Sequence, residues 1–186
     1  KKINSILPQK FHVEQKLDKN KAKELFNRIA KEEPTRFADL VGKMKALGDT
    51  HAYDIGFSAS VKDLLVDTKV RDALFARVDK AVATLKSKEK PGPKLDEKVA
   101  NLYEAAAKEA YEMSAKKQLV DKDSSFYHMV NSGAKGSASD LQQLVSAPGI
   151  MLDSNNKKVP VPVKNSYAEG LTTSDYFISS YGARKG

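Results

Sequence analysis

The sequence has 186 residues, 40% of them hydrophobic and 30% charged, and 32 Lys and Arg against 24 Asp and Glu give a net charge of +8. This length suits one ordinary domain or two or three small subdomains with a large polar surface. The absence of Cys excludes disulfides, thiolate zinc sites and a Cys nucleophile. No run approaches the roughly 20 apolar residues of a membrane-spanning helix.

The basic charge balance has two interpretations. Lys and Arg bind polyanions through phosphate contacts and the release of counterions. A solvated, lysine-rich helix surface accounts for the same balance. The opening residues Lys1–Asn4 include neither an initiator Met nor the apolar run of a secretory signal, which predicts that the sequence is a fragment.

Residues 1–66 are expected to form a small α+β module. Asp18 is a candidate N-cap for a helix that ends at Glu32–Pro34, and a second helix is expected from Thr35 to a C-cap at Gly48. The apolar residues that recur at helical spacing are Ala22, Leu25, Phe26 and Ile29 in the first helix and Phe37, Leu40, Val41, Met44 and Leu47 in the second. After Asp49 the pattern changes. Apolar residues then alternate with small polar ones at Ile55, Phe57, Ala59 and Val61, which predicts a short strand.

Residues 67–122 are expected to form an antiparallel helical hairpin. Each arm carries one narrow apolar stripe, and the polar turn Ser87–Lys94 contains two prolines around a glycine. At 1.5 Å per residue, an arm of roughly 22 residues extends about 33 Å, so most of its surface lies in water. The stripes are Val70, Leu74, Val78, Val82 and Leu85 in the first arm and Leu95, Val99, Leu102, Ala106, Ala110 and Met113 in the second.

Residues 123–186 are rich in Gly, Ser, Asn and Pro, and the helical period fades. Asp140–Val145 predicts a short helix. Ile150–Leu152 and Val159–Val163 predict two short strands, and the prolines in the second strand restrict its pairing to an edge.

A last helix is predicted from Thr172, the candidate N-cap, with Asp175 at capping-box spacing. The sequence stops a few turns into this helix, which again favours a fragment. The predicted fold is mainly α with irregular α+β parts.

General catalytic motifs are missing from the sequence. His12, His51 and His128 are far apart, and none has a second His at metal-ligand spacing. Asp121 and Asp123 are expected to be a solvated helix end, and neither a nucleophile elbow nor a P-loop occurs. Judged by general catalytic motifs alone, the sequence predicts a binding or structural chain with no catalytic residue and no metal site.

Two segments suggest phosphate contacts. Ser132–Ser137 places Lys135 in a run of Gly and Ser, whose exposed amides and hydroxyls can contact phosphate together with the ammonium. Gly182–Gly186 holds Arg184 and Lys185 between two glycines, each of which weakens a helix by roughly 1 kcal/mol relative to Ala. The alternative interpretations are a flexible turn and a frayed basic terminus.

Several strings occur together in a fixed order near the end of the sequence. They are Ser132–Ser137, Leu141–Leu144, Pro148–Gly149, Glu169–Leu171, Tyr176–Ser179 and Gly182–Gly186. In order and spacing they closely resemble the β′ subunit of bacterial-type RNA polymerases, in the stretch that leads through the F-loop into the bridge helix. Upstream, Ile3–Pro8 resembles the opening of the pore region, and Lys45–Gly48 and Gly56–Ser60 resemble its next landmarks. The hairpin then corresponds to the funnel helices at the rim of the secondary channel.

The resemblance implies a fragment of an enzyme that transfers nucleotidyl groups from NTPs to an RNA 3′ end on a DNA template. Mg²⁺ in that enzyme is bound by an aspartate triad outside this chain, so the chain alone is expected to be inactive. The expected partners are a β-like subunit, the remaining β′ parts, template DNA, the RNA 3′ end and NTPs. No membrane contact is expected, and the implied location is the cytoplasm of a bacterial or phage-infected cell.

The resemblance also implies roles for particular residues. Lys135, with Ser132, Gly133 and Gly136, would bind NTP phosphates. The F-loop would include Gln142, Gln143, Pro148, Gly149, Ile150 and Met151. The N-terminal hinge of the bridge helix would include Tyr176, Phe177, Tyr181, Gly182, Arg184, Lys185 and Gly186.

The sequence departs from typical bacterial relatives at three places. Lys135 stands where they usually have Arg, which keeps the charge but loses bidentate phosphate binding. Ser146–Pro148 replaces a basic, glycine-containing run, and Tyr181 replaces a common His. These differences favour a phage-encoded or otherwise divergent polymerase.

Two alternatives remain at this stage. One is a stand-alone regulator that inserts a helical hairpin into a polymerase, but the turn Lys86–Lys94 is basic apart from Glu89 and lacks the acidic tip such a role needs. The other is a basic helical protein that binds nucleic acid with a salt-dependent affinity. That alternative leaves the order of the C-terminal motifs unexplained.

Overall fold

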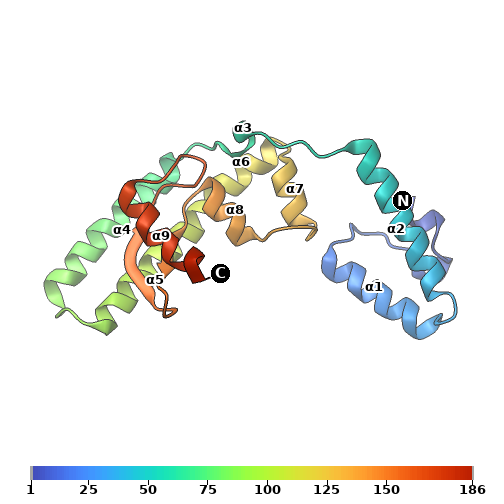
Figure 1. Cartoon of the computed structure of the whole chain (residues 1–186), viewed down its shortest axis with the longest axis horizontal. Helices are drawn as coiled ribbons and strands as arrows, with labels where there is room; N and C mark the ends of the chain where they lie inside the picture. Colours follow the sequence, from blue (N-terminus) through green and yellow to red (C-terminus); the bar gives the residue numbers. More distant parts are fainter. Residues whose placement is uncertain (1, 186) are drawn as a thin grey trace.

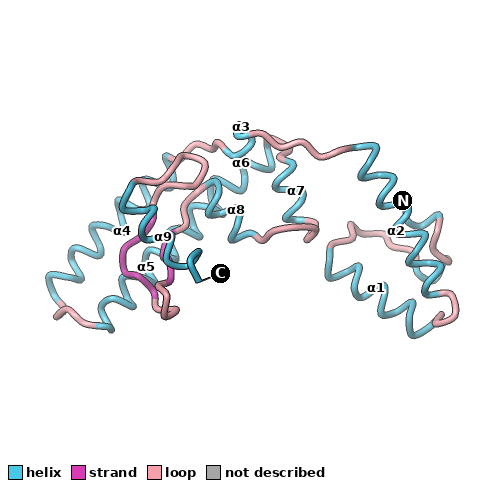
Figure 2. Tube along the Cα trace, in the orientation of Figure 1, coloured by secondary structure: helices cyan, strands magenta, loops and turns pink. Residues whose placement is uncertain are grey.

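A computed structural model describes the backbone of residues 2–185 and the side chains of residues 2–181. Helices dominate, and the described strands form one two-stranded sheet (Figures 1 and 2), so the predicted mainly α fold is confirmed. The α-helices are α1 (Lys19–Glu32), α2 (Phe37–Ile55), α3 (Val61–Leu64), α4 (Lys69–Lys88), α5 (Pro93–Ala110), α6 (Lys116–Asp121), α7 (Ser125–Asn131), α8 (Ala138–Val145) and α9 (Thr173–Lys185). The strands are β1 (Gly149–Leu152) and β2 (Lys158–Val163), and short 3₁₀ turns cover Lys2–Ser5 and Gln9–Phe11.

The N-terminal module, residues 2–55, has a hydrophobic core of its own. Its buried residues are Leu7, Phe11, Leu25, Ile29 and Leu40. Asp18 caps α1 as predicted, because its carboxylate accepts hydrogen bonds from the amides of Asn20 and Lys21 at 3.0 and 2.9 Å. Helix α1 ends at Glu32, also as predicted, and α2 packs against α1.

The prediction of a short strand at Ile55–Val61 is wrong. Helix α2 continues through Gly48 to Ile55, so Gly48 is not its C-cap. Gly56 has a φ of 70° and ends the helix. Ser60 and Asp63 then form a capping box that starts α3. The alternating apolar residues therefore belong to a helix end and a linker, and no strand partner reaches them within residues 2–66.

The predicted helical hairpin is confirmed as α4 and α5, which are joined by a short turn. Phe75, Val82, Leu95, Val99 and Tyr103 lie between the arms, together with Ala107 and Ala147. The rings of Phe75 and Tyr103 stack at 6.2 Å between centroids. Both arms contribute to one core, as their single apolar stripes predicted.

The second arm contains a π-helical turn at Tyr111–Ala115 and continues into α6. One extra residue per turn rotates the following face of a helix. Tyr111, Ala115 and Leu119 are buried as a result, whereas Met113, a predicted stripe residue, is 60% exposed. A regular helical period could not predict this change of face.

The last section packs against the hairpin. Helix α8 and the two strands occur where they were predicted, and Thr172 caps α9 by accepting a hydrogen bond from the Asp175 amide at 3.2 Å. Helix α7, which was not predicted, contributes to a third core with Leu141 and Val145 of α8. The strands pair antiparallel, with Gly149 opposite Val163. They lie against α5, and α9 lies against the strands.

The N-terminal module lies at one end of the molecule and the hairpin turn at the other (Figure 1). The linker between them contacts α7 through Phe57 and Phe126, whose rings meet edge to face at 6.1 Å. Among residues 2–185, no helix has the length and apolar character needed to cross a bilayer.

Candidate functional site

The glycine loop, residues 132–136, joins α7 to α8. Gly133 and Gly136 both have φ angles of +76°, a conformation that favours glycine. A Cβ at Gly133 would lie 2.7 Å from the Cβ of Lys19, at the start of α1. The loop therefore depends on glycine both for its backbone angles and for its close approach to α1.

Lys135 offers the cation of this loop. Its side chain is exposed, and no hydrogen bond or ion pair holds its ammonium within the described part of the chain. The first turn of α8 is already occupied, because the Asp140 carboxylate accepts the Ser137 amide at 2.7 Å. The Ser132 hydroxyl donates to the Met129 carbonyl at 3.0 Å. Of the four predicted phosphate-binding residues, Lys135 thus has the side chain best placed to contact an anion.

Gln142 and Gln143, both predicted F-loop residues, lie near the C-terminal end of α8 and make hydrogen bonds to residues beyond it. The Gln142 side chain donates to the Ala147 carbonyl at 3.2 Å. The Gln143 carbonyl accepts the Tyr167 amide at 3.1 Å, and the next carbonyl, of Leu144, accepts the Ala168 amide at 3.0 Å. These contacts tie α8 to a segment more than twenty positions further along the chain.

The predicted residues from Pro148 to Met151 anchor β1 to the hairpin. Gly149 has a φ of +74°, and a Cβ there would lie 2.9 Å from the Cβ of Ala107 on α5. Pro148 is buried, Met151 is half-buried, and Ile150 packs against the hairpin core. The backbone of β1 therefore approaches α5 as closely as glycine allows.

Helix α9 presents aromatic side chains to solvent. Tyr176 is 62% and Phe177 59% exposed, and Tyr181 is also exposed. The Tyr176 and Phe177 rings meet edge to face at 6.1 Å. The backbone of α9 continues through the other predicted hinge residues, Gly182, Arg184 and Lys185. The side chains of Arg184 and Lys185 and all of Gly186 lie outside the described residues.

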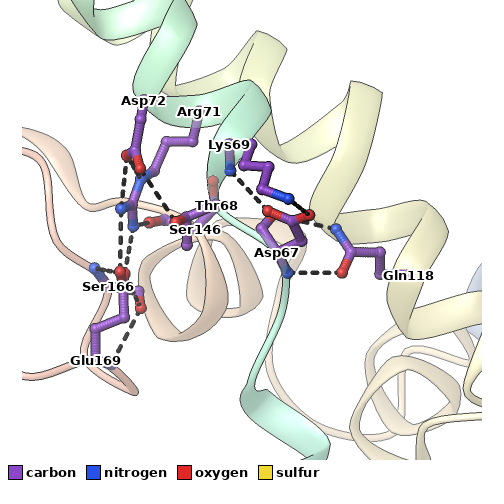
Figure 3. A network of polar contacts seen from close by, with 9 residues as sticks. All are labelled: Asp67, Thr68, Lys69, Arg71, Asp72, Gln118, Ser146, Ser166 and Glu169. Carbon is purple, nitrogen blue, oxygen red and sulfur yellow. Dashed lines mark hydrogen bonds and ion pairs between the residues drawn. The ribbon is translucent and has the colours of Figure 1, made fainter.

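A buried arginine that the sequence did not single out joins these parts (Figure 3). Arg71, near the start of α4, is only 5% exposed. Its guanidinium donates to the Ser146 carbonyl at 2.8 Å, to both carboxylate oxygens of Glu169, and to Asp72 at 2.9 Å. We call Arg71, Glu169, Ser146, Ser166 and Asp72 the Arg71 cluster. It brings the start of the hairpin, the end of α8 and the approach to α9 to one point.

Glu169 holds its place in the cluster through a local turn as well. Its carboxylate accepts hydrogen bonds from the Ser166 amide at 2.9 Å and the Ser166 hydroxyl at 2.7 Å. Burial by itself would raise the pKa of Glu169, but the Arg71 and Ser166 hydrogen bonds outweigh it and lower the pKa below its usual value. Glu169 is therefore held as a carboxylate.

The model of the family described as RNA polymerase Rpb1, domain 4, matches residues 80–182, from α4 into α9. The chain belongs to this family. The RNA polymerase domain-4 match covers the glycine loop, the predicted F-loop residues and all of the Arg71 cluster except Arg71 and Asp72 themselves.

Curated relatives extend the RNA polymerase similarity over most of the chain. A DNA-directed RNA polymerase subunit beta′ from Petrotoga mobilis is 32% identical over 177 residues, which cover 92% of this chain and 11% of the relative. A subunit beta″ from Rhodomonas salina is 35% identical over 156 residues, covering 81% and 12%. A subunit beta′ from Caldanaerobacter subterraneus is 29% identical over 177 residues, covering 91% and 14%. The chain therefore spans between 11% and 14% of the length of these relatives, and the predicted resemblance to a β′ fragment is confirmed.

One sequence signal could have found Arg71, which precedes the stretch matched by the RNA polymerase family model. Arg71 precedes Leu74 and Phe75 by three and four residues, so it lies on the apolar face of α4. A charged residue on a buried stripe requires a partner. That pattern predicts a buried ion pair, but the partner, 98 positions away, cannot be read from it.

Because the pKa of Glu169 is lowered, the stability of this RNA polymerase domain is expected to depend on pH in the acidic range. A carboxyl whose pKa is lower in the folded state stabilises the fold above its unfolded pKa, near 4.5, and loses that effect as pH falls through the folded value. Glu169→Gln is expected to lower the free energy of unfolding at neutral pH and to reduce its further loss below about pH 4.5. Urea titrations at several pH values measure both effects.

A matched control is Glu97→Gln on α5. Glu97 is exposed and has no ion pair in the described part of the chain. That variant should keep the wild-type pH profile. A Glu169→Gln profile that parallels the wild type down to low pH would contradict the assigned role of Glu169.

Proposed function

We propose that this chain is the part of a DNA-directed RNA polymerase β′ subunit that lines the NTP-entry channel and supports the active site. The similarity to β′ and β″ subunits over most of the chain carries this proposal. In it, the α4–α5 hairpin forms the channel rim. The glycine loop, α8, β1 and the start of α9 form the support beneath the reacting groups.

The packing of the matched stretch supports this division of roles. Helix α5 contacts both strands, α9 contacts the strands, and α8 contacts the π-helical turn that follows α5. Lys158 of β2 also bonds to Glu104 of α5 at 2.6 Å. A closely packed body of this kind suits a scaffold that keeps mobile substrates and nucleic acid correctly positioned relative to one another.

The proposed chemistry needs Mg²⁺ from elsewhere in the enzyme. Among the described residues, no group of three or more His, Cys, Asp or Glu side chains could hold a metal ion. This chain would bind and position, while nucleotidyl transfer occurs on metal ligands outside it.

Lys135 is proposed to contact the phosphates of an incoming NTP. Lys135→Ala in the assembled polymerase is expected to raise the KM for NTPs about threefold to tenfold, because a hydrogen bond to a charged group contributes on the order of 1 kcal/mol or more. The maximal rate should change little. Steady-state elongation over a range of NTP concentrations measures both parameters.

The control for this variant is Lys117→Ala, which removes an exposed lysine from α6. Its KM should equal that of the wild type, which separates a local contact from a loss of overall positive charge. An unchanged KM in Lys135→Ala would remove Lys135 from the phosphate site.

Helix α9 is proposed to be the N-terminal part of the bridge helix. Its exposed aromatic residues, Tyr176, Phe177 and Tyr181, are then available to the rest of β′, a β-like subunit, template DNA or the RNA 3′ end. Gly182, with Arg184, Lys185 and Gly186, would form the hinge, because glycine lowers the cost of bending a helix.

A tagged pull-down from the native source tests the proposal as a whole. The expected result is recovery of the chain's sequence in a complex with a β-like chain and a chain bearing the aspartate triad, identified by intact mass. Recovery alone, or with bulk nucleic acid only, would overturn the assignment to a polymerase.

A further inference from the structure

We propose that Arg71 is a positioning residue that sets where α9 begins relative to the hairpin and the glycine loop. The inference rests on the function proposed above, in which α9 supports the active site. It assigns to Arg71 an effect on the rate of nucleotide addition, although Arg71 lies on the hairpin and outside the loops assigned to substrate.

The Arg71 guanidinium joins α4, the end of α8 and the segment before α9. One nitrogen, Nη1, donates both to the Ser146 carbonyl at the end of α8 and to Glu169, while Nη2 donates to Glu169 at 3.0 Å. Nε donates to Asp72 on the same helix, which fixes the plane of the group. One buried side chain thus connects three segments that are far apart in the sequence (Figure 3).

Glu169 lies only a short distance along the chain from the start of α9. Thr173, the first residue of α9, follows Glu169 by four positions, and Thr172 caps the helix. The preceding amides, of Tyr167 and Ala168, bond to the last turn of α8. Movement of Glu169 would therefore shift the start of α9 and weaken the bonds of Tyr167 and Ala168 to α8.

The contacts at position 71 require the geometry of an arginine side chain. A guanidinium presents five donors in a fixed plane and binds a carboxylate in bidentate fashion. A lysine ammonium at the same place keeps the charge, but it cannot hold both Glu169 oxygens and the Ser146 carbonyl in one plane. The bond to Ser146 lies in the buried interior, so its loss would leave the Ser146 carbonyl without a hydrogen-bond partner.

The test uses preassembled elongation complexes of the polymerase that contains this chain. Rapid-quench measurements of single-nucleotide addition at several NTP concentrations give the maximal rate and the half-saturating NTP concentration per active complex. In Arg71→Lys the maximal rate is expected to fall about threefold, and in Arg71→Met about tenfold, since small misplacements of a supporting group reduce rate strongly. The half-saturating NTP concentration should stay within about twofold of the wild-type value.

Two further variants make the result specific. Glu169→Gln should lower the maximal rate in the same way, and the double variant Arg71→Met, Glu169→Gln should be no slower than Arg71→Met alone, because both act through one contact. Lys158→Ala is the matched control. It removes another long-range ion pair, to Glu104, from the same body but leaves the approach to α9 intact, and it should keep the wild-type rate.

The outcomes separate the inference from the function on which it rests. Wild-type maximal rates in active complexes of Arg71→Lys and Arg71→Met would overturn the positioning role, even if fewer complexes assemble. If Arg71→Met does not assemble, Arg71→Lys decides the question. Active polymerase that lacks this chain altogether would instead overturn the proposed function.

Discussion

Phe11→Ala is expected to unfold the N-terminal module while the hairpin and the sheet stay folded. Phe11 is fully buried and is the largest side chain in the core formed with Leu7, Leu25, Ile29 and Leu40. Truncating a buried Phe costs roughly 3–5 kcal/mol. A module of this size has a total stability at or below about 5 kcal/mol, so the loss is comparable to the whole stability of the module.

The structure explains why the loss stays local. None of the five buried residues of this core belongs to either of the other two core clusters, and the linker after Ile55 separates them along the chain. Lys10 and Arg28, whose charged groups lie 5.0 and 5.2 Å from the Phe11 ring centroid, would lose their cation–π contacts at the same time.

Hydrogen exchange measured by mass spectrometry distinguishes local from global unfolding. In Phe11→Ala, amide protection should disappear in residues 2–55 and persist in α4, α5 and β2. The control, Ile55→Ala, truncates an apolar side chain that is 81% exposed, and it should change stability by no more than about 0.5 kcal/mol. Loss of protection throughout the Phe11→Ala chain would show that the cores are energetically coupled.

Gly149→Val is expected to destabilise the hairpin–sheet body by about 3 kcal/mol. The positive φ of Gly149 disfavours any β-branched residue by roughly 1–3 kcal/mol. The added Cβ would also lie 2.9 Å from the Cβ of Ala107, and crowding a packed interior costs a further 1–3 kcal/mol or so. Neither atom can move without shifting β1 or α5.

Gly48→Ala is the matched control for Gly149→Val. Gly48 lies inside α2, and a Cβ there would meet nothing within 4 Å. The substitution should stabilise the N-terminal module by roughly 0.4–1 kcal/mol, because it reduces the freedom of the unfolded chain. Urea unfolding midpoints of the two variants should therefore move in opposite directions. A neutral Gly149→Val would mean that β1 does not require its close approach to α5.

Elements governed by local rules were predictable from the sequence. The Asp18 and Thr172 caps, the turn between α4 and α5, and the two short strands all depend on residues a few positions apart. The strand at Ile55–Val61 was wrong because alternation describes an exposed linker equally well when no partner strand is near. The π-helical turn escaped prediction because it breaks the regular period on which such predictions depend.

The candidate site was predictable only in its separate segments. The segments of the glycine loop and of the predicted F-loop residues stand out as strings, but the sequence did not show that Gln142 and Gln143 make hydrogen bonds to the residues beyond the end of α8. The Arg71–Glu169 contact joins residues 98 positions apart and follows from tertiary packing alone. The apolar pattern of α4 can point to Arg71 as a charged residue on the buried face, but it cannot identify Glu169 as the partner.

The 98 positions between Arg71 and Glu169 affect how the chain folds during synthesis on the ribosome. The N-terminal module and the hairpin are built from contacts between neighbouring segments, so both can fold soon after they emerge. The Arg71 side chain must wait for Glu169, which is translated 98 residues later, or roughly 5–20 s at ordinary rates of synthesis. During that interval Arg71 has Asp72 as a partner but lies on an apolar face without Glu169 and the Ser146 carbonyl. Nascent chains paused there should be the most sensitive to proteolysis and the most dependent on chaperones.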